Sequence, residues 1–219
     1  MRVLSPAGER GSLKWLQIAV NRAPDTLALP ALNKTINWVS PLADDEFAEY
    51  RDSSFLARLG LSHLNQDLAA FWPSRGPQWD ALGIAGQSVV LVEAKAHLNE
   101  FFSPPCAAGD TTRPKIEAAL RTAKIALGVE PATDWTTRFY QYTNRLAHLN
   151  FLRCQGVDAH LVFVSFLHDV DMGGPSSAAE WDAAFRTADH VLGLGKRHAL
   201  SPYIHHVHPD VRPLMQLKL

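Results

Sequence analysis

Residues 78–95 read QWDALGIAGQSVVLVEAK, and this stretch decides the fold. Two short runs, 78–84 and 88–94, are rich in apolar and β-branched residues and flank Ala85-Gly86-Gln87. This pattern predicts a β-hairpin that turns on Gly86-Gln87, with glycine first as a type II′ turn requires. The second run is apolar almost throughout, which is typical of a central strand covered on both faces.

Helical and strand patterns continue on both sides of this hairpin. Apolar spacing predicts several helices, and Gly60, Gly128 and Gly156 stand just past the ends of three of them. The predicted helices cover 41–59, 62–71, 113–127, 136–155 and 178–192, and further strands are predicted at 157–166 and 203–207. The first helix is predicted from Ser40 as its cap and from acidic residues in its first turn. Together these elements predict an α/β fold with a mixed central β-sheet flanked by helices.

Composition limits the class of protein. The 219 residues, 47% of them hydrophobic, are enough for one large core, so we expect residues 1–40 to be an N-terminal extension packed on one domain, 41–219. The net charge of −1 gives no overall attraction to nucleic acid or to anionic membranes. Two widely separated cysteines and the lack of a long apolar run predict a cytoplasmic protein with no membrane partner, and a homo-oligomer is left open.

The chemically informative residues lie at one end of the hairpin. Residues two apart on a strand point to the same face, so Glu93 and Lys95 should project together. A turn at Gly86-Gln87 places Asp80 directly across from Glu93, where two carboxylates would repel each other. A hard cation bound by Asp80 and Glu93, with help from the Ala94 carbonyl, removes this conflict, and Mg²⁺ or Mn²⁺ suits such oxygen ligands. Lys95 beside the ion would orient or help deprotonate a metal-bound water.

An aspartate on one hairpin strand, followed by an apolar strand that ends in Glu-x-Lys, resembles the motif of the PD-(D/E)XK nuclease superfamily. The resemblance rests on Asp80, Glu93 and Lys95 and spans roughly residues 41–166, with Trp79 where the motif has proline. It implies a restriction-endonuclease-like core and metal-dependent cleavage of nucleic acid, with DNA expected before RNA. Glu49 and Gln141 resemble two accessory positions of that superfamily, an acid before the hairpin and a glutamine on the helix after it.

Each of these assignments has a plainer alternative. Glu93 and Lys95 would form an ordinary ion pair at a solvated strand end, and Asp80 would be a turn residue. Glu49 and Gln141 would be exposed polar residues on helices. At the level of function, the alternative is a nuclease-like scaffold that binds a protein or nucleic acid without cutting it.

Two further groups of residues are candidates for ligand contacts. Arg138 and Arg145 share one face of the predicted helix 136–155 and are candidates for phosphate contacts. His205, His206 and His208 stand close together near the C-terminus. His206 and His208 are candidate zinc ligands on one strand face that lack a third ligand, and the alternative is a polar strand edge.

Overall fold

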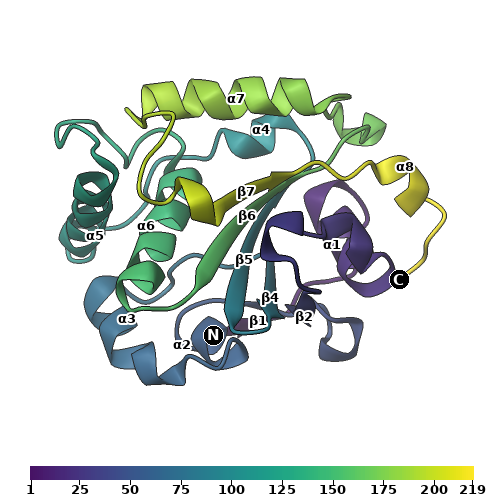
Figure 1. The fold of residues 1–219 in the computed structure, drawn as a ribbon, viewed down its shortest axis with the longest axis horizontal. Coiled ribbons are helices and arrows are strands. Elements are labelled where there is room, and N and C mark those ends of the chain that lie inside the picture. Colours follow the sequence, from purple (N-terminus) through teal and green to yellow (C-terminus); the bar gives the residue numbers. More distant parts are fainter.

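The structure of the protein is a computed structural model that describes all residues 1–219, and its centre is a five-stranded mixed β-sheet (Figure 1). The strand order is β2-β4-β5-β6-β7; the pairs β2·β4 and β4·β5 are antiparallel, and β5·β6 and β6·β7 are parallel. The strands are β2 (Asn37–Ser40), β4 (Ala81–Ala85), β5 (Ser88–Lys95), β6 (Ala159–Ser165) and β7 (Ile204–Val207). The predicted α/β class with a mixed central sheet is confirmed.

Helices cover both faces of this sheet. They are α1 (Gly11–Arg22), α2 (Ser53–Arg58), α3 (Asn65–Phe71), α4 (Leu98–Phe101), α5 (Arg113–Leu127), α6 (Tyr140–Cys154), α7 (Ala178–Val191) and α8 (Val211–Leu214). Figure 1 shows α5 and α6 on one side of the sheet and α1 and α8 on the other. None of these helices is both long and apolar enough to cross a bilayer.

The central strand β5 separates two hydrophobic cores. Val89 and Leu91 belong to the larger core, formed with α5, α6 and α7, whereas Val90 and Val92 belong to the smaller core, formed with α1 and α8. This alternation is the two-residue period of a strand, and it confirms that β5 is covered on both faces. The period also assigns Glu93 to the same face as Val89 and Leu91, the face covered by α6.

The hairpin has the predicted register. Ala85 pairs with Ser88 across the two-residue turn, and Gly86 has a φ of 65°, as the first position of a type II′ turn requires. Ala81 pairs with Val92, so Asp80 stands opposite Glu93 one step further along.

The predicted helix 41–59 is wrong. The chain instead forms a 3₁₀ turn at Ala43–Asp45, the short strand β3 (Glu49–Tyr50) and α2. Strand β3 pairs with β1 (Arg2–Val3), a partner more than forty residues away that local patterns do not reveal. Glu46 and Phe47 have φ values of 54° and 50°, which an α-helix cannot contain.

The other predicted helices and strands lie close to their predicted positions. Helix α6 begins at Tyr140 instead of 136, because Phe139 has a φ of 52°. Within residues 1–40, β2 forms an edge strand of the main sheet and α1 packs on the smaller core. The division of the chain at residue 40 stays a prediction.

Candidate functional site

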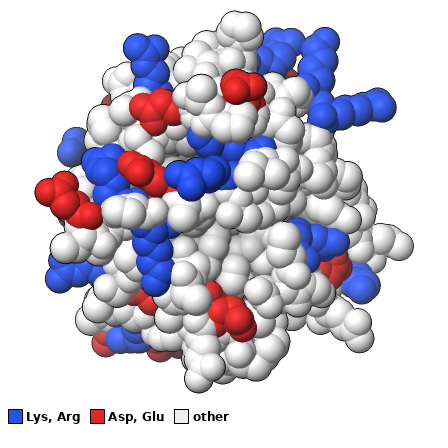
Figure 2. Space-filling view, turned by 90° about the vertical axis from the view of Figure 1, so that its left-hand side faces the viewer, with Lys and Arg blue, Asp and Glu red and all other residues white.

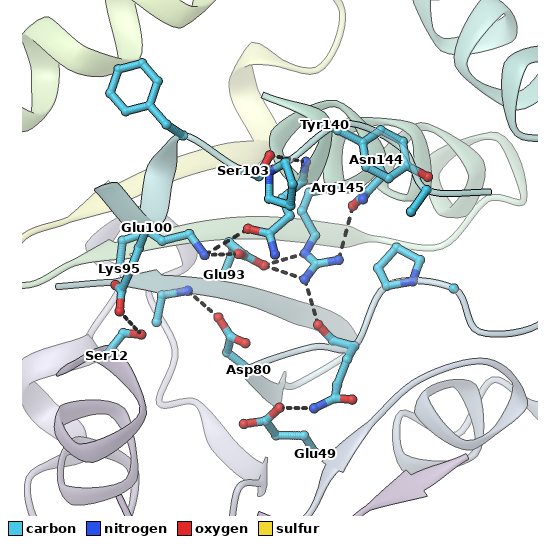
Figure 3. Close-up of a pocket in the computed structure, with 18 of the residues that line it drawn as sticks. Ser12, Glu49, Asp80, Glu93, Lys95, Glu100, Ser103, Tyr140, Asn144 and Arg145 are labelled. Atoms are coloured by element: carbon cyan, nitrogen blue, oxygen red, sulfur yellow. Dashed lines mark hydrogen bonds and ion pairs between the residues drawn. The ribbon is translucent and has the colours of Figure 1, made fainter. Parts of the chain in front are cut away.

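A pocket of about 670 Å³ opens beside the end of β5 (Figure 3). All five predicted site residues line it, and they come from separate elements. Glu49 lies on β3, Asp80 just before β4, Glu93 and Lys95 on β5, and Gln141 in the first turn of α6. The structure therefore brings these side chains together, while the role of each stays a prediction.

Glu93 is the centre of a buried ion cluster. Glu93 is 3% exposed, which rules out the alternative of a solvated strand end. Lys95 Nζ lies 2.5 Å from Oε1 of Glu93, and Arg145 Nε lies 2.6 Å from Oε2. Burial alone would raise the pKa of Glu93, but the charges of Arg145 and Lys95 outweigh it and hold this pKa below its usual value. Glu93 is therefore ionised at neutral pH.

Arg145 also belongs to this pocket, although the sequence places it only on one face of a helix. It is 4% exposed, donates to the Gln78 carbonyl at 2.7 Å and to Asn144 Oδ1 at 3.1 Å, and lies over the ring of Trp79. Its four-residue spacing from Gln141 puts both on one face of α6, and this was the signal that could have found it. Arg138, its predicted companion, is exposed and lies outside this pocket.

Lys95 connects β5 to α6. Besides Glu93, its ammonium group donates to Gln141 Oε1 at 3.3 Å. The backbone N–H of Gln141 donates to Ser103 Oγ, which ties the start of α6 to the loop after α4. Burial lowers the pKa of Lys95, but Glu93 and Asp80 outweigh this effect and raise it. Lys95 is therefore a fixed positive charge at neutral pH.

Among the predicted site residues, Asp80 and Glu49 carry the two carboxyl groups without a cationic partner. Asp80 Oδ2 accepts a hydrogen bond from the Ala94 backbone N–H at 2.7 Å, and Glu49 accepts one from the Gln78 side chain. Burial, followed by the negative charges of Glu93 and Glu49, raises the pKa of Asp80 well above its usual value. Burial also raises the pKa of Glu49. A positive charge between these groups would favour their ionised forms.

The carboxyl groups of the pocket match the type of ligand that Mg²⁺ or Mn²⁺ prefers, but they are not arranged as a metal site. Carboxylate oxygens are the preferred ligands of these ions, and four carboxyl groups line this one pocket, those of Glu49, Asp80, Glu93 and Glu100. No group of three or more His, Cys, Asp and Glu side chains is arranged closely enough to hold a metal ion, and both oxygens of Glu93 are in contact with cations. The donor set therefore fits a hard cation in chemical type, and binding through Glu93 would replace a contact with Lys95 or Arg145.

The histidines near the C-terminus do not converge on a zinc site. His206 packs its ring against Phe163 and Phe185, with centroids 5.4 and 4.3 Å apart. His205 Nε2 lies 3.0 Å from His160 Nδ1, and His208 faces Asp182. The three side chains serve different contacts along β7.

On the face drawn in Figure 2, Lys and Arg side chains are interspersed with Asp and Glu, and no broad region carries only one sign. This agrees with the net charge of −1. Binding of a polyanion would therefore depend on local positive groups such as Arg75, Lys95 and Arg145, which line the pocket.

Comparison with known proteins gave no match: no family model, no curated protein and no solved structure is significantly similar to this chain.

Proposed function

We propose that this protein is a metal-dependent nuclease of the PD-(D/E)XK type, with a restriction-endonuclease-like core, that hydrolyses phosphodiester bonds in DNA with Mg²⁺ or Mn²⁺. The observation that supports this proposal is the position of Asp80, Glu93 and Lys95 in one pocket, at the end of the central strand. Two acids and a lysine at these positions form the pattern on which the sequence resemblance rests. The antiparallel hairpin followed by a parallel strand is consistent with that core.

The chain's own residues divide the chemistry between them. When bound, a hard cation held by Asp80 and Glu93 would supply charge stabilisation at the phosphate and a more acidic water. Lys95, charged and fixed by Glu93 and Gln141, orients the attacking water and stabilises negative charge on the phosphate. Arg145 holds the Glu93 carboxylate in place from α6. Glu49 supplies a further carboxyl group on the opposite wall of the pocket (Figure 3).

Metal binding tests the first part of this proposal. Calorimetric titration with Mn²⁺ should show a site in the wild type that Asp80→Asn abolishes, because this change removes one ligand charge without changing side-chain size. Asp67→Asn is the matched control, because Asp67 is exposed on α3 and lies outside the pocket. Equal Mn²⁺ affinity in the wild type and Asp80→Asn would rule out the assigned ligand.

Cleavage assays test the second part. Single-stranded DNA, duplex DNA and RNA should be incubated with Mg²⁺ or Mn²⁺, and Lys95→Ala should reduce the cleavage rate by roughly a hundredfold or more. Lys196→Ala, at an exposed position away from the pocket, should cleave at the wild-type rate. Absence of cleavage on all three substrates, or full activity in Lys95→Ala, contradicts the assignment.

One observation favours a second candidate, a scaffold that binds a protein or nucleic-acid partner without cutting it. Glu93 already has two cationic neighbours, so its charge is balanced without a metal. For such a scaffold, added Mn²⁺ should leave the melting temperature unchanged, because an ion that does not bind the folded state cannot stabilise it. A nuclease with a carboxylate site should melt at higher temperature as Mn²⁺ is added.

A further inference from the structure

A second cavity, of about 230 Å³, adjoins the candidate active site. It lies between α2, α3 and the segment 72–77, and its lining includes His148 of α6. Trp72, Gly76 and Pro77 line both cavities, so this short segment is their common wall. Ligand pockets for drug-sized molecules hold roughly 300–1,000 Å³. The smaller cavity therefore suits a single ring system and not a whole nucleotide.

Apolar side chains form part of the lining of this cavity. Phe55, Leu68 and Trp72 contribute to it, and each is no more than 6% exposed. Flat aromatic side chains are the usual surfaces on which nucleobases stack, with little dependence on the identity of the base. This part of the lining is suited to a planar ligand.

Two hydrogen-bond acceptors in the same lining have no partner. His148 Nδ1 lies 2.8 Å from the Asn144 carbonyl, which can only accept, so Nδ1 carries the ring hydrogen. Burial lowers the pKa of His148 to about 3, so the ring is neutral and Nε2 is left as an acceptor. Asn65 Oδ1 is buried and also accepts no hydrogen bond. The unsatisfied buried oxygen of Asn65 and the acceptor nitrogen of His148 together favour a ligand that donates hydrogen bonds.

The charged residues of this cavity also limit the choice of ligand. Asp52 also lines it and accepts hydrogen bonds from the backbone N–H groups of Arg75 and Gly76. Lys115 lines the cavity too, but its ammonium group donates to the Ala69 carbonyl. The three acceptors therefore favour a ligand that donates hydrogen bonds over a phosphate or a carboxylate. A neutral ring that carries an amino group has the complementary chemistry.

We propose that this cavity binds the base of an unpaired nucleotide that carries an exocyclic amino group, such as adenine or cytosine, while the phosphate of the same strand occupies the larger pocket. The placement of the phosphate rests on the proposed nuclease function; binding of the base does not. Enzymes that act on bases taken out of the stack read them by hydrogen bonds to the Watson–Crick edge and by stacking. Single-stranded or locally unpaired DNA is therefore the substrate class.

Gly76 keeps the common wall thin. A Cβ atom at this position would lie 3.2 Å from Trp72 Cδ1 and 3.3 Å from Asp52 Oδ1, both tighter than ordinary contacts. The side chains of Trp72 and Asp52 therefore fill the space beside Gly76, and a larger residue at position 76 would displace one of them.

Ligand binding can be measured apart from metal and cleavage. Adenosine should be titrated against the intact protein in EDTA and followed by saturation-transfer NMR, with purine riboside, which lacks the amino group, as the matched ligand. Adenosine should bind and purine riboside should bind at least roughly threefold more weakly, as expected for loss of a hydrogen bond. No adenosine binding, or equal binding of both ligands, overturns the proposal.

Variants locate the site. Asn65→Ala should weaken adenosine binding roughly 3- to 10-fold, whereas Gln66→Ala, exposed and next to it on α3, should leave binding unchanged. His148→Phe removes the second acceptor and serves as an independent variant if its circular dichroism is that of the wild type. Wild-type binding in Asn65→Ala overturns the proposal. Lys95→Ala should bind adenosine normally, so failure of cleavage and failure of base binding are separate results.

Discussion

Replacement of Arg145 by methionine should be among the most damaging substitutions in the protein. Arg145 is 4% exposed and shares Glu93, which is 3% exposed, with Lys95. Methionine fills a similar volume but leaves a buried carboxylate with one cationic partner and removes the donor to the Gln78 carbonyl. Breaking a buried ion pair by removal of one partner costs about 3–5 kcal/mol, so the free energy of unfolding should fall by this amount.

Urea unfolding followed by circular dichroism at neutral pH would measure this effect. Arg138→Met is the control, because Arg138 is exposed and its loss should change stability by less than about 0.5 kcal/mol. In a double-mutant cycle, Arg145→Met should cost less in a Glu93→Gln background than in the wild type, because the Arg145–Glu93 ion pair is then already absent. A loss below about 1 kcal/mol in Arg145→Met, or additive effects in the cycle, would refute the reasoning.

Three further predictions concern other parts of the molecule. Burial holds the pKa of His148 at about 3, so below pH 6.5 the unfolded chain takes up a proton that the folded chain does not. The free energy of unfolding should therefore fall by about 2 kcal/mol between pH 6.5 and 5 because of this residue. Urea unfolding of His148→Phe should show a flatter dependence of stability on pH. Gly174→Ala should destabilise the protein by about 1–3 kcal/mol, because the new Cβ would lie 2.3 Å from a backbone oxygen, whereas Gly109→Ala, with no neighbour within 4 Å, should melt at the wild-type temperature or higher. Trp15→Phe removes the Nε1 donor, which lies 2.7 Å from Asp169 Oδ2 in the core, and should lower the free energy of unfolding by about 1–3 kcal/mol in chemical denaturation. If Trp15→Phe costs the same in an Asp169→Ala background, loss of this hydrogen bond is not the cause.

The sequence predicts the elements that depend on neighbouring residues, namely the hairpin turn, the strand period and the helix ends. The turn at Gly86-Gln87 fixes the register of β4 and β5, and the two-residue period of β5 then fixes which face Glu93 and Lys95 share. Helix α5 has its predicted bounds, and Gly128 ends it with a left-handed φ of 69°. The relative placement of Asp80, Glu93 and Lys95 was therefore accessible from sequence.

Contacts between segments far apart in the chain could not be predicted from the sequence. Glu49 was expected on a helix because Asp44, Asp45 and Glu46 suit a first helical turn, yet pairing with Val3 makes it part of a strand. Asp45 contacts Arg2 and Arg58 instead of a helix end. Arg145 could be placed on a helix face by its spacing, but only tertiary packing shows that this face meets Glu93.

The two-residue turn at Gly86-Gln87 also limits how this gene can change in length. Insertion or deletion of one codon there would slide β4 by one residue against β5 and exchange the inward and outward faces of the strand. Asp80 would then no longer stand across from Glu93, and Leu82 would turn away from its core. Length variants among natural homologues should therefore spare this turn and fall in exposed loops, such as the one that contains Gly109.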